Sequence, residues 1–218
     1  MQHLSDHTDL VEDLRRRVRG EVRFDAVSRA LYSTDASIYE IEPIGVVLPR
    51  DADDVQAVLE ITHTAKVPVL PRGGGTSLAG QAVGRAVVLD FSKYMNRALE
   101  VDPAAGWARV QAGIVRNELS AVLAPAGLVF GPETSTSDRA TIGGMIGNNS
   151  SGARSIIYGK TVDQVAEVRA FLAGGDQVVF RALAADEVAA RAGQDGPEGR
   201  LYREIPRIIQ ESRAEVAR

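Results

Sequence analysis

Two glycine-rich segments hold the residue types that could bind an anion through the main chain. The first, PRGGGTSLAGQ at residues 71–81, has three consecutive glycines, and the second, residues 131–161, is rich in Gly, Ser, Thr and Asn. Glycine accepts positive φ, so successive N–H groups can turn towards one anion, and neighbouring hydroxyls can add donors. Two converging loops of this kind suit a diphosphate better than a single phosphate. Each loop alone is also compatible with a tight turn.

Two common nucleotide-binding motifs do not fit these segments. A dinucleotide-binding GxGxxG would need a third glycine where Leu78 stands. The GKT at residues 159–161 invites comparison with the phosphate loop GxxxxGK[ST], but that motif needs glycine at the position of Arg154. An NTPase remains an alternative, and it predicts nucleotide hydrolysis that is lost in Lys160→Ala. We expect no such hydrolysis.

Side chains that could act as nucleophiles, bases or metal ligands are scarce. The chain contains no cysteine, which excludes disulfides, thiolate catalysis, cysteinyl flavin links and cysteine-ligated clusters within it. The histidines are His3, His7 and His63, two of them close to the N-terminus, so we expect no metal site. No carboxylate or histidine is a persuasive base, and the catalytic residues stay unknown. The DASIY pattern at residues 35–39 favours structural packing.

Composition and charge narrow the class of protein. The chain has 218 residues, of which 44% are hydrophobic and 25% charged, as in soluble globular proteins. A net charge of −4 argues against nucleic acid as a partner. The basic cluster at residues 15–19 follows acidic residues at helical spacing, which indicates a solvated helix end. No apolar run approaches the roughly 20 residues of a membrane span, and the N-terminus is polar, so we expect a cytoplasmic protein without a transmembrane segment.

The first glycine-rich segment is positioned by a β-α-β pattern. Residues 44–49 read as a buried strand, and Asp51 caps a helix with acidic residues in its first turn. Residues 67–71 and 86–91 read as two more strands, with the glycine loop between them. The preceding residues 1–40 are predicted to form an amphipathic helix followed by an irregular arm.

The second glycine-rich segment lies in a region with a different pattern of apolar and polar residues. Residues 107–113 alternate as a half-buried strand, and an amphipathic helix then runs to about Pro125 and Gly127. Within the segment, residues 143–146 are predicted to open a helix. Residues 166–180 form a hairpin through Gly174-Gly175-Asp176, and a charged helix ends the chain. The pattern as a whole predicts an α+β protein.

The two segments together carry a family resemblance. PRGGGTSLAGQ followed by GPETSTSDRATIGGMIGNNSSGARSIIYGKTVDQV resembles the FAD domain of the vanillyl-alcohol oxidase / p-cresol methylhydroxylase (PCMH-type) superfamily. Within it, the D-lactate dehydrogenase and glycolate oxidase flavoproteins are the most similar branch, over about residues 30–218. The resemblance implies a two-lobed PCMH-type fold, with a small β-α-β lobe and a larger lobe of antiparallel sheet flanked by helices. The implied divisions are residues 1–40 (helix and arm), 41–94 (lobe 1) and 95–218 (lobe 2).

The resemblance also implies which residues meet the cofactor. Main chain of the first loop would wrap the FAD pyrophosphate, and the second segment would line the cofactor from the other lobe, with a later strand at the adenine end. The implied residues are Arg72, Gly73, Gly74, Gly75, Thr76, Ser77, Gly80, Gln81, Pro132, Glu133, Thr134, Thr141, Gly143, Gly144, Asn148, Ser151, Gly152 and Val168. Gly74→Val is predicted to abolish FAD binding with limited effect on folding, because its Cβ would block the phosphate.

The mode of attachment and the activity follow from the same resemblance. Covalent members carry histidine where this sequence has Thr76, and others use cysteine, so the FAD is expected to be non-covalent. The implied function is the FAD-binding portion of a dehydrogenase that oxidises a D-2-hydroxy acid of the D-lactate, glycolate or D-2-hydroxyglutarate class. The substrate domain, an iron–sulfur region or another electron acceptor, and peripheral attachment to a membrane would belong to a longer protein. The alternative is an FAD-binding module without turnover of its own.

Overall fold

The computed structural model describes residues 8–217, which form two compact units. The first contains residues up to 165 together with 173–175, and the second contains residues 166–172 and 176 onwards. The two glycine-rich segments both belong to the first unit. The prediction of a helix at the N-terminus falls partly on residues 1–7, including His3 and His7, which lie outside the described residues.

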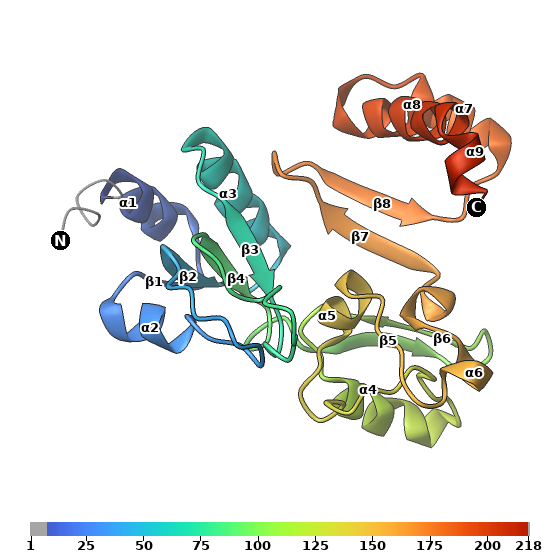
Figure 1. The fold of residues 1–218 in the computed structure, drawn as a ribbon, viewed down its shortest axis with the longest axis horizontal. Coiled ribbons are helices and arrows are strands. Elements are labelled where there is room, and N and C mark those ends of the chain that lie inside the picture. Colours follow the sequence, from blue (N-terminus) through green and yellow to red (C-terminus); the bar gives the residue numbers. More distant parts are fainter. Residues whose placement is uncertain (1–7, 218) are drawn as a thin grey trace. The chain divides into compact units, whose positions relative to one another are not determined.

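A four-stranded sheet forms one half of the first unit, in the order β1-β2-β4-β3 (Figure 1). Its strands are β1 (Glu21–Arg23), β2 (Gly45–Leu48), β3 (Val69–Arg72) and β4 (Val87–Asp90). The last three are parallel, and β1 is antiparallel to β2. Every residue of β2 and β4 is buried, as expected for central parallel strands covered on both faces. The predicted β-α-β unit is therefore confirmed.

Three helices accompany this sheet: α1 (Thr8–Arg17), α2 (Ala26–Leu31) and α3 (Ala52–Thr64). Helix α3 connects β2 to β3 and packs against α1, beside which it lies in Figure 1. Asp51 is its N-cap and accepts a hydrogen bond from the Asp54 amide, as predicted. Strand β1 was not predicted, so the segment before residue 41 is more than a helix and an arm.

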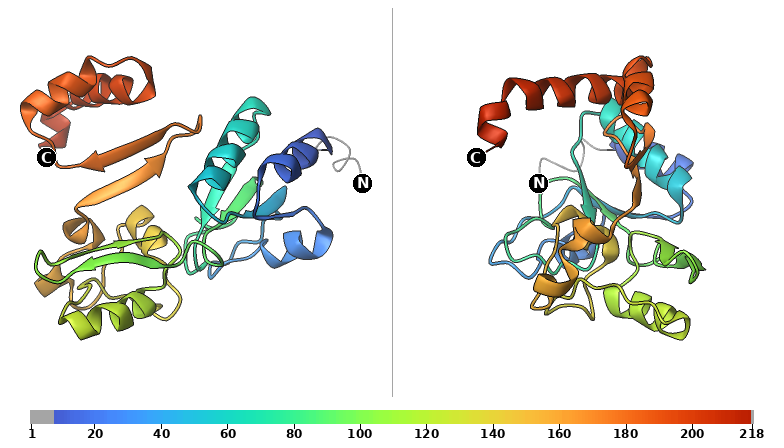
Figure 2. Two further views of the ribbon diagram at one scale, coloured as in Figure 1. Left: turned by 180° about the vertical axis from the view of Figure 1, so that it is seen from behind. Right: turned by 90° about the vertical axis from the view of Figure 1, so that its right-hand side faces the viewer.

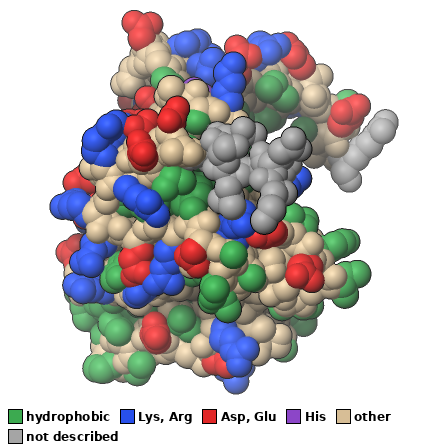
Figure 3. Space-filling view, turned by 90° about the vertical axis from the view of Figure 1, so that its left-hand side faces the viewer, with side chains coloured by type: hydrophobic (Ala, Val, Ile, Leu, Met, Phe, Trp, Pro, Cys, Tyr) green, Lys and Arg blue, Asp and Glu red, His purple; other side chains and the backbone are tan. Residues whose placement is uncertain are grey.

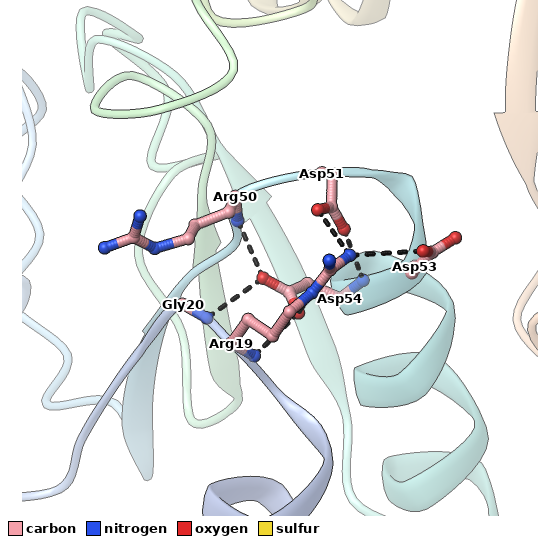
Figure 4. Close-up of polar contacts among 6 residues, drawn as sticks. All are labelled: Arg19, Gly20, Arg50, Asp51, Asp53 and Asp54. Atoms are coloured by element: carbon pink, nitrogen blue, oxygen red, sulfur yellow. Dashed lines mark hydrogen bonds and ion pairs between the residues drawn. The ribbon is translucent and has the colours of Figure 1, made fainter.

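Asp54 shows how this protein holds an anion with main-chain amides. Its carboxylate is buried, with an exposed fraction of 1%, and accepts hydrogen bonds from the amides of Arg19 (2.8 Å), Gly20 (3.0 Å) and Arg50 (2.8 Å) (Figure 4). The Arg19 guanidinium lies over the same helix start and pairs with Asp51 at 2.6 Å. The carboxylate thus joins the α1–β1 connection to α3. Arg15, Arg16 and Arg17 at the end of α1 are exposed, as is Arg19 after it, which confirms the predicted solvated helix end.

The other half of the first unit carries the second glycine-rich segment. Strands β5 (Ala98–Asp102) and β6 (Trp107–Val110) form an antiparallel pair, and α4 (Arg116–Leu123), the 3-10 turn η2 (Ala124–Ala126) and α5 (Ile142–Gly147) follow. Two short turns, α6 (Ser155–Tyr158) and η3 (Thr161–Gln164), end this half. Gly127 ends α4–η2 at a φ of 68°, as its position predicted. A shared core holds the segment in place: Ile114, Leu119, Leu123, Ala140, Ile142 and Met145.

The second unit is a hairpin followed by helices. Strands β7 (Glu167–Phe171) and β8 (Gln177–Arg181) pair antiparallel, which confirms the predicted hairpin. Helices α7 (Ala185–Ala192) and α8 (Gly196–Glu211) pack together, and α9 (Arg213–Val216) follows. Across the described residues, no helix is both long and apolar enough to cross a membrane. On the face drawn in Figure 3, basic and acidic side chains are interspersed, so this face offers no continuous basic surface.

Candidate functional site

The first glycine loop leaves the carboxyl end of β3 with its amides unused. Within the described chain, the N–H groups from Gly73 to Gln81 donate to no protein acceptor. Gly75 and Gly80 have φ values of 63° and 76°, the left-handed region that glycine adopts without strain. Gly74, Leu78, Ala79 and Gln81 are exposed and the other residues of the loop are half-buried, so these amides are open to water or to a ligand. The loop is therefore a main-chain donor surface.

Arg72, the only cation of this loop, is directed inwards. Its guanidinium donates hydrogen bonds to the carbonyls of Thr34 and Ala82, both at 2.8 Å, and lies 5.2 Å from the ring centroid of Tyr32. The ideal Cβ of a residue replacing Gly75 would lie 2.7 Å from the same guanidinium. The side chain thus supports the loop from behind, and the main-chain amides and the Thr76 hydroxyl are other donors of the loop.

The arm at residues 32–41 forms the back of the loop. The Ala36 amide donates to the Gly75 carbonyl at 3.0 Å, and the Asp35 carboxylate accepts from the amides of Ser37 and Ala82. Partial burial raises the pKa of Asp35, but the hydrogen bonds from Ser37 and Ala82 outweigh it and hold that pKa below its usual value. This matches the structural packing expected for the DASIY pattern.

The two glycine-rich segments meet where the first loop begins. A Cβ on Gly73 would lie 2.0 Å from the Thr141 hydroxyl oxygen, and a Cβ on Gly74 would lie 2.2 Å from the Arg139 carbonyl oxygen. In Figures 1 and 2 the loop after β3 accordingly lies beside the start of α5. The prediction that Gly74→Val would have limited effect on folding is wrong, because its side chain meets a backbone atom of the neighbouring segment.

Helix α5 presents a different surface from the first loop. Thr141 caps it and accepts from the Gly144 amide at 3.3 Å. The amides of Ile142 and Gly143 already donate to the carbonyls of Ile114 and Ala112. Gly144 is exposed, and the Thr141 hydroxyl oxygen is the nearest atom to its ideal Cβ, at 3.2 Å. A ligand can therefore come close to the backbone of the helix start at Gly144, whereas the amides without a protein acceptor lie on the first loop.

Three contacts place some of the remaining sequence-predicted residues of the second segment. Gly152 packs on Glu133 so closely that a Cβ would lie 1.5 Å from its carbonyl oxygen. Arg154 pairs with the Glu133 carboxylate at 3.3 Å, and Asn148 accepts a long hydrogen bond of 3.4 Å from the Gln81 side chain. These contacts, with those at Gly73 and Gly74, place parts of the two glycine-rich segments side by side, and the cofactor roles of the residues stay predictions. Val168 lies on β7 in the second unit, and its role stays a prediction.

The GKT at residues 159–161 does not form a phosphate loop. Thr161 is fully buried, and both its hydroxyl and its amide donate to the Ser150 carbonyl, at 2.7 Å and 3.0 Å. The Lys160 amide is bonded to the Asp163 carboxylate at 2.7 Å. In a phosphate loop this threonine would bind the nucleotide-associated cation, and the amides would bind phosphate. The NTPase alternative therefore has no structural support.

One buried polar pair near the loop was missed from the sequence. The Tyr32 hydroxyl donates to the Asp90 carboxylate, which also accepts from the Ser92 amide at 2.8 Å. Burial and the Asp90 charge raise the pKa of Tyr32. The described residues contain no cluster of three metal-ligating side chains. Neither Tyr32 nor Asp90 is singled out by spacing or motif, so only tertiary contacts could find them.

Comparison with known proteins places this site in a family. The family described as an FAD binding domain matches residues 43–181. D-2-hydroxyglutarate dehydrogenase of Pseudomonas putida is 41% identical over 97% of this chain, and glycolate oxidase subunit GlcD of Bacillus subtilis is 33% identical over 88% of it. Among solved structures, p-cresol methylhydroxylase matches 81% of this chain with a TM-score of 0.71 and 21% identity. Alkyldihydroxyacetonephosphate synthase matches 83% of it with a TM-score of 0.72 and 23% identity.

The matched lengths differ greatly between this chain and its relatives. The chain spans 21% of the Pseudomonas putida dehydrogenase and 43% of the Bacillus subtilis subunit. It covers 35% and 36% of the two solved structures. The α+β fold is nevertheless theirs, and the family match extends over well over half of the chain, including both glycine-rich segments. The chain belongs to the family described as an FAD binding domain.

Proposed function

We propose that this chain provides the FAD-binding part of a flavin-dependent dehydrogenase that oxidises a D-2-hydroxy acid. The observation that carries the proposal is the run of unpartnered amides from Gly73 to Gln81, set beside the exposed Gly144 of α5. A diphosphate supplies many acceptor oxygens and would satisfy several of these amides at once. The names of the relatives support a substrate of the D-2-hydroxyglutarate, glycolate or D-lactate class.

The residues of this chain bind and orient the cofactor. The amides of the first loop hold the pyrophosphate, and its glycines keep side chains away from the approach. Thr141, Gly144 and Gly152 would contact the cofactor from the second segment. FAD, when bound, supplies the oxidising chemistry for the α-carbon of the hydroxy acid. Val168, on β7, lines the adenine end.

Attachment of the cofactor is non-covalent. Thr76 stands where covalent relatives carry histidine, and the chain has no cysteine. A threonine hydroxyl has neither the nucleophilicity of a thiolate nor that of an imidazole. Acid precipitation of the flavin-loaded protein is expected to leave all of the flavin in the supernatant. Flavin that stays with the precipitate would overturn this part of the proposal.

The rest of the catalytic machinery is assigned to other parts of a longer protein. In this proposal residues 41–94 and 95–218 form the two lobes around the cofactor, and residues 1–40 support the first. Substrate orientation, the base for the hydroxyl proton, and an electron acceptor such as an iron–sulfur domain lie outside these residues. The proposed location is the cytoplasm, with peripheral attachment to a membrane as the alternative.

Flavin titration of the purified chain tests the proposal. FAD is expected to bind with quenching of its fluorescence, and riboflavin, which lacks the pyrophosphate, is expected to bind far more weakly. Addition of D-2-hydroxyglutarate, glycolate or D-lactate without oxygen then tests turnover by bleaching of the flavin absorbance. Because the proposal assigns substrate orientation and the base to other residues, we expect bound flavin that no hydroxy acid reduces, and bleaching by this chain alone would show that those functions lie within it. A folded protein that takes up no FAD would refute the proposal.

A further inference from the structure

The side chain of Arg72 connects both ends of the amide loop to the arm behind it. Arg72 is the last residue of β3, and its carbonyl accepts from the Phe91 amide at 3.1 Å, so its main chain is fixed in the sheet. Its guanidinium reaches the carbonyl of Ala82, the residue directly after the loop, and that of Thr34 in the arm, both at 2.8 Å. One side chain therefore holds the start and the end of the loop together.

Only an arginine can make this set of contacts. Its planar guanidinium presents five donors in a fixed fork and stacks on aromatic faces, whereas a lysine ammonium is a flexible point charge. Here the fork serves two carbonyls, with a third, that of Tyr32, at 3.4 Å, while the plane lies over the Tyr32 ring. The ring is fixed in turn by its hydroxyl bond to Asp90.

The same guanidinium controls the conformation of the loop itself. It lies behind Gly75, whose ideal Cβ would be 2.7 Å from it, and Gly75 adopts a φ of 63°. The Gly75 carbonyl points to the arm and accepts from the Ala36 amide. The C=O and N–H groups of one trans peptide point in opposite directions, so the Thr76 amide is directed away from the arm. Arg72, which bonds the arm at Thr34 and lies behind Gly75, supports this peptide.

We infer that Arg72 is a positioning residue that pre-forms the main-chain anion cradle of residues 73–81 before the cofactor binds. Its Nη1 and Nη2 atoms already donate to the carbonyls of Tyr32, Thr34 and Ala82, so we assign the guanidinium to support of the loop rather than to phosphate binding. Binding costs less conformational free energy when the protein surface already has its bound conformation, so the affinity for FAD depends on the fraction of molecules in which the cradle is formed. This inference rests on the proposed function and adds a specific role to one side chain.

The test compares Arg72→Met and Arg72→Lys with Arg85→Met. Arg85 is an exposed arginine that follows the loop, so its variant removes the same charge without touching the cradle contacts. Both Arg72 variants are expected to weaken FAD binding about 30-fold, which is about 2 kcal/mol at 1.4 kcal/mol per factor of ten. Riboflavin affinity is expected to stay unchanged in all three, because riboflavin has no pyrophosphate. A general loss of structure would weaken both ligands.

Hydrogen exchange at the Ala36 amide gives a second readout that needs no flavin. That amide donates to the Gly75 carbonyl, so its protection reports the loop conformation in the protein without cofactor. Protection is expected to fall in both Arg72 variants and to persist in Arg85→Met. If wild-type protein binds no FAD, the proposed function fails, while this readout still tests the positioning role.

Three results would overturn the inference. The first is wild-type FAD affinity in Arg72→Met. The second is full affinity in Arg72→Lys, which would show that charge alone suffices. The third is unchanged protection of the Ala36 amide in Arg72→Lys, the variant expected to disturb folding least. Weaker FAD binding with retained riboflavin binding and lost Ala36 protection would support it.

Discussion

Two glycines of the same helix allow the position of the cofactor to be tested with one methyl group each. Gly144 and Gly147 both lie in α5 and are both exposed. An ideal Cβ on Gly147 meets nothing within 4 Å, and one on Gly144 meets only the Thr141 hydroxyl oxygen, at 3.2 Å. Neither replacement by alanine therefore creates a backbone clash in the protein without cofactor.

The expected effects on folding and on binding have opposite signs at Gly144. Alanine in place of glycine stabilises a helix by about 0.5–1 kcal/mol, because the unfolded chain has less conformational freedom to lose. Gly144→Ala and Gly147→Ala are therefore both expected to raise the midpoint of urea unfolding, or to leave it unchanged. If the pyrophosphate passes over Gly144, the added methyl costs about 1–3 kcal/mol of overpacking, which weakens FAD binding by about 10- to 100-fold.

The assay is FAD titration of the two variants beside urea unfolding of the same preparations. Gly144→Ala should bind FAD less well while remaining as stable as the wild type, and Gly147→Ala should bind FAD normally. Wild-type affinity in Gly144→Ala would remove the first turn of α5 from the site. A lower unfolding midpoint in Gly144→Ala would show that the Thr141 hydroxyl, 3.2 Å from the added Cβ, cannot shift without loss of the helix cap, and would refute this reasoning.

Three further predictions concern stability. Asp54→Asn should lower the free energy of unfolding, measured by urea titration, by about 2–4 kcal/mol, because it weakens three amide hydrogen bonds to a buried carboxylate. The control Asp53→Asn, at an exposed residue, should change it by less than about 0.5 kcal/mol. Hydrogen bonds from Lys93 and Tyr94 lower the pKa of Glu21 to about 2. Glu21 therefore contributes about 1 kcal/mol to the free energy of unfolding after solvent screening, and this contribution is present above pH 4.5 and lost as the pH falls towards 2. Glu21→Gln should abolish this loss. Gly74→Val should lower the midpoint of thermal unfolding as well as FAD affinity, since its Cβ meets a carbonyl of the second segment.

Each of these has a clear contrary result. Equal unfolding free energies for Asp54→Asn and wild type would mean that the three amides find other acceptors. An acid titration of stability that is identical in Glu21→Gln would place the pH dependence on other carboxylates. Full thermal stability in Gly74→Val would show that the two segments can separate without loss of the fold.

The β-α-β unit could be predicted because each of its signals is local. Val46, Val47, Val87 and Val88 stand in short apolar runs, and Asp51 is followed by acidic residues at the helix start. Runs and caps of this kind depend on neighbours within a few residues, which is what a single sequence displays. The α4 helix, the glycine at its end and the β7–β8 hairpin were predicted for the same reason.

Several features that were missed depend on contacts between distant residues. Strand β1 is only Glu21–Arg23, too short for an alternating pattern, and exists because it pairs with β2. Asp54 looks like any acidic residue of a first helical turn, although it is buried and holds three amides of other segments. The guanidinium of Arg72 likewise reaches carbonyls that lie 10 and 38 residues away.

The absence of a lysine from the first loop has a consequence for how this site tolerates substitution. Where a side chain binds phosphate, its replacement removes the contact directly. Here the free donors belong to the main chain, so substitutions at Thr76, Ser77 or Leu78 leave the amides in place as long as the loop keeps its path. Substitutions that change the path, at Gly73, Gly75 or Arg72, act on all of the donors together. The loss of FAD affinity caused by a substitution in this loop should therefore depend on how much it changes the backbone conformation rather than on the chemistry of the side chain.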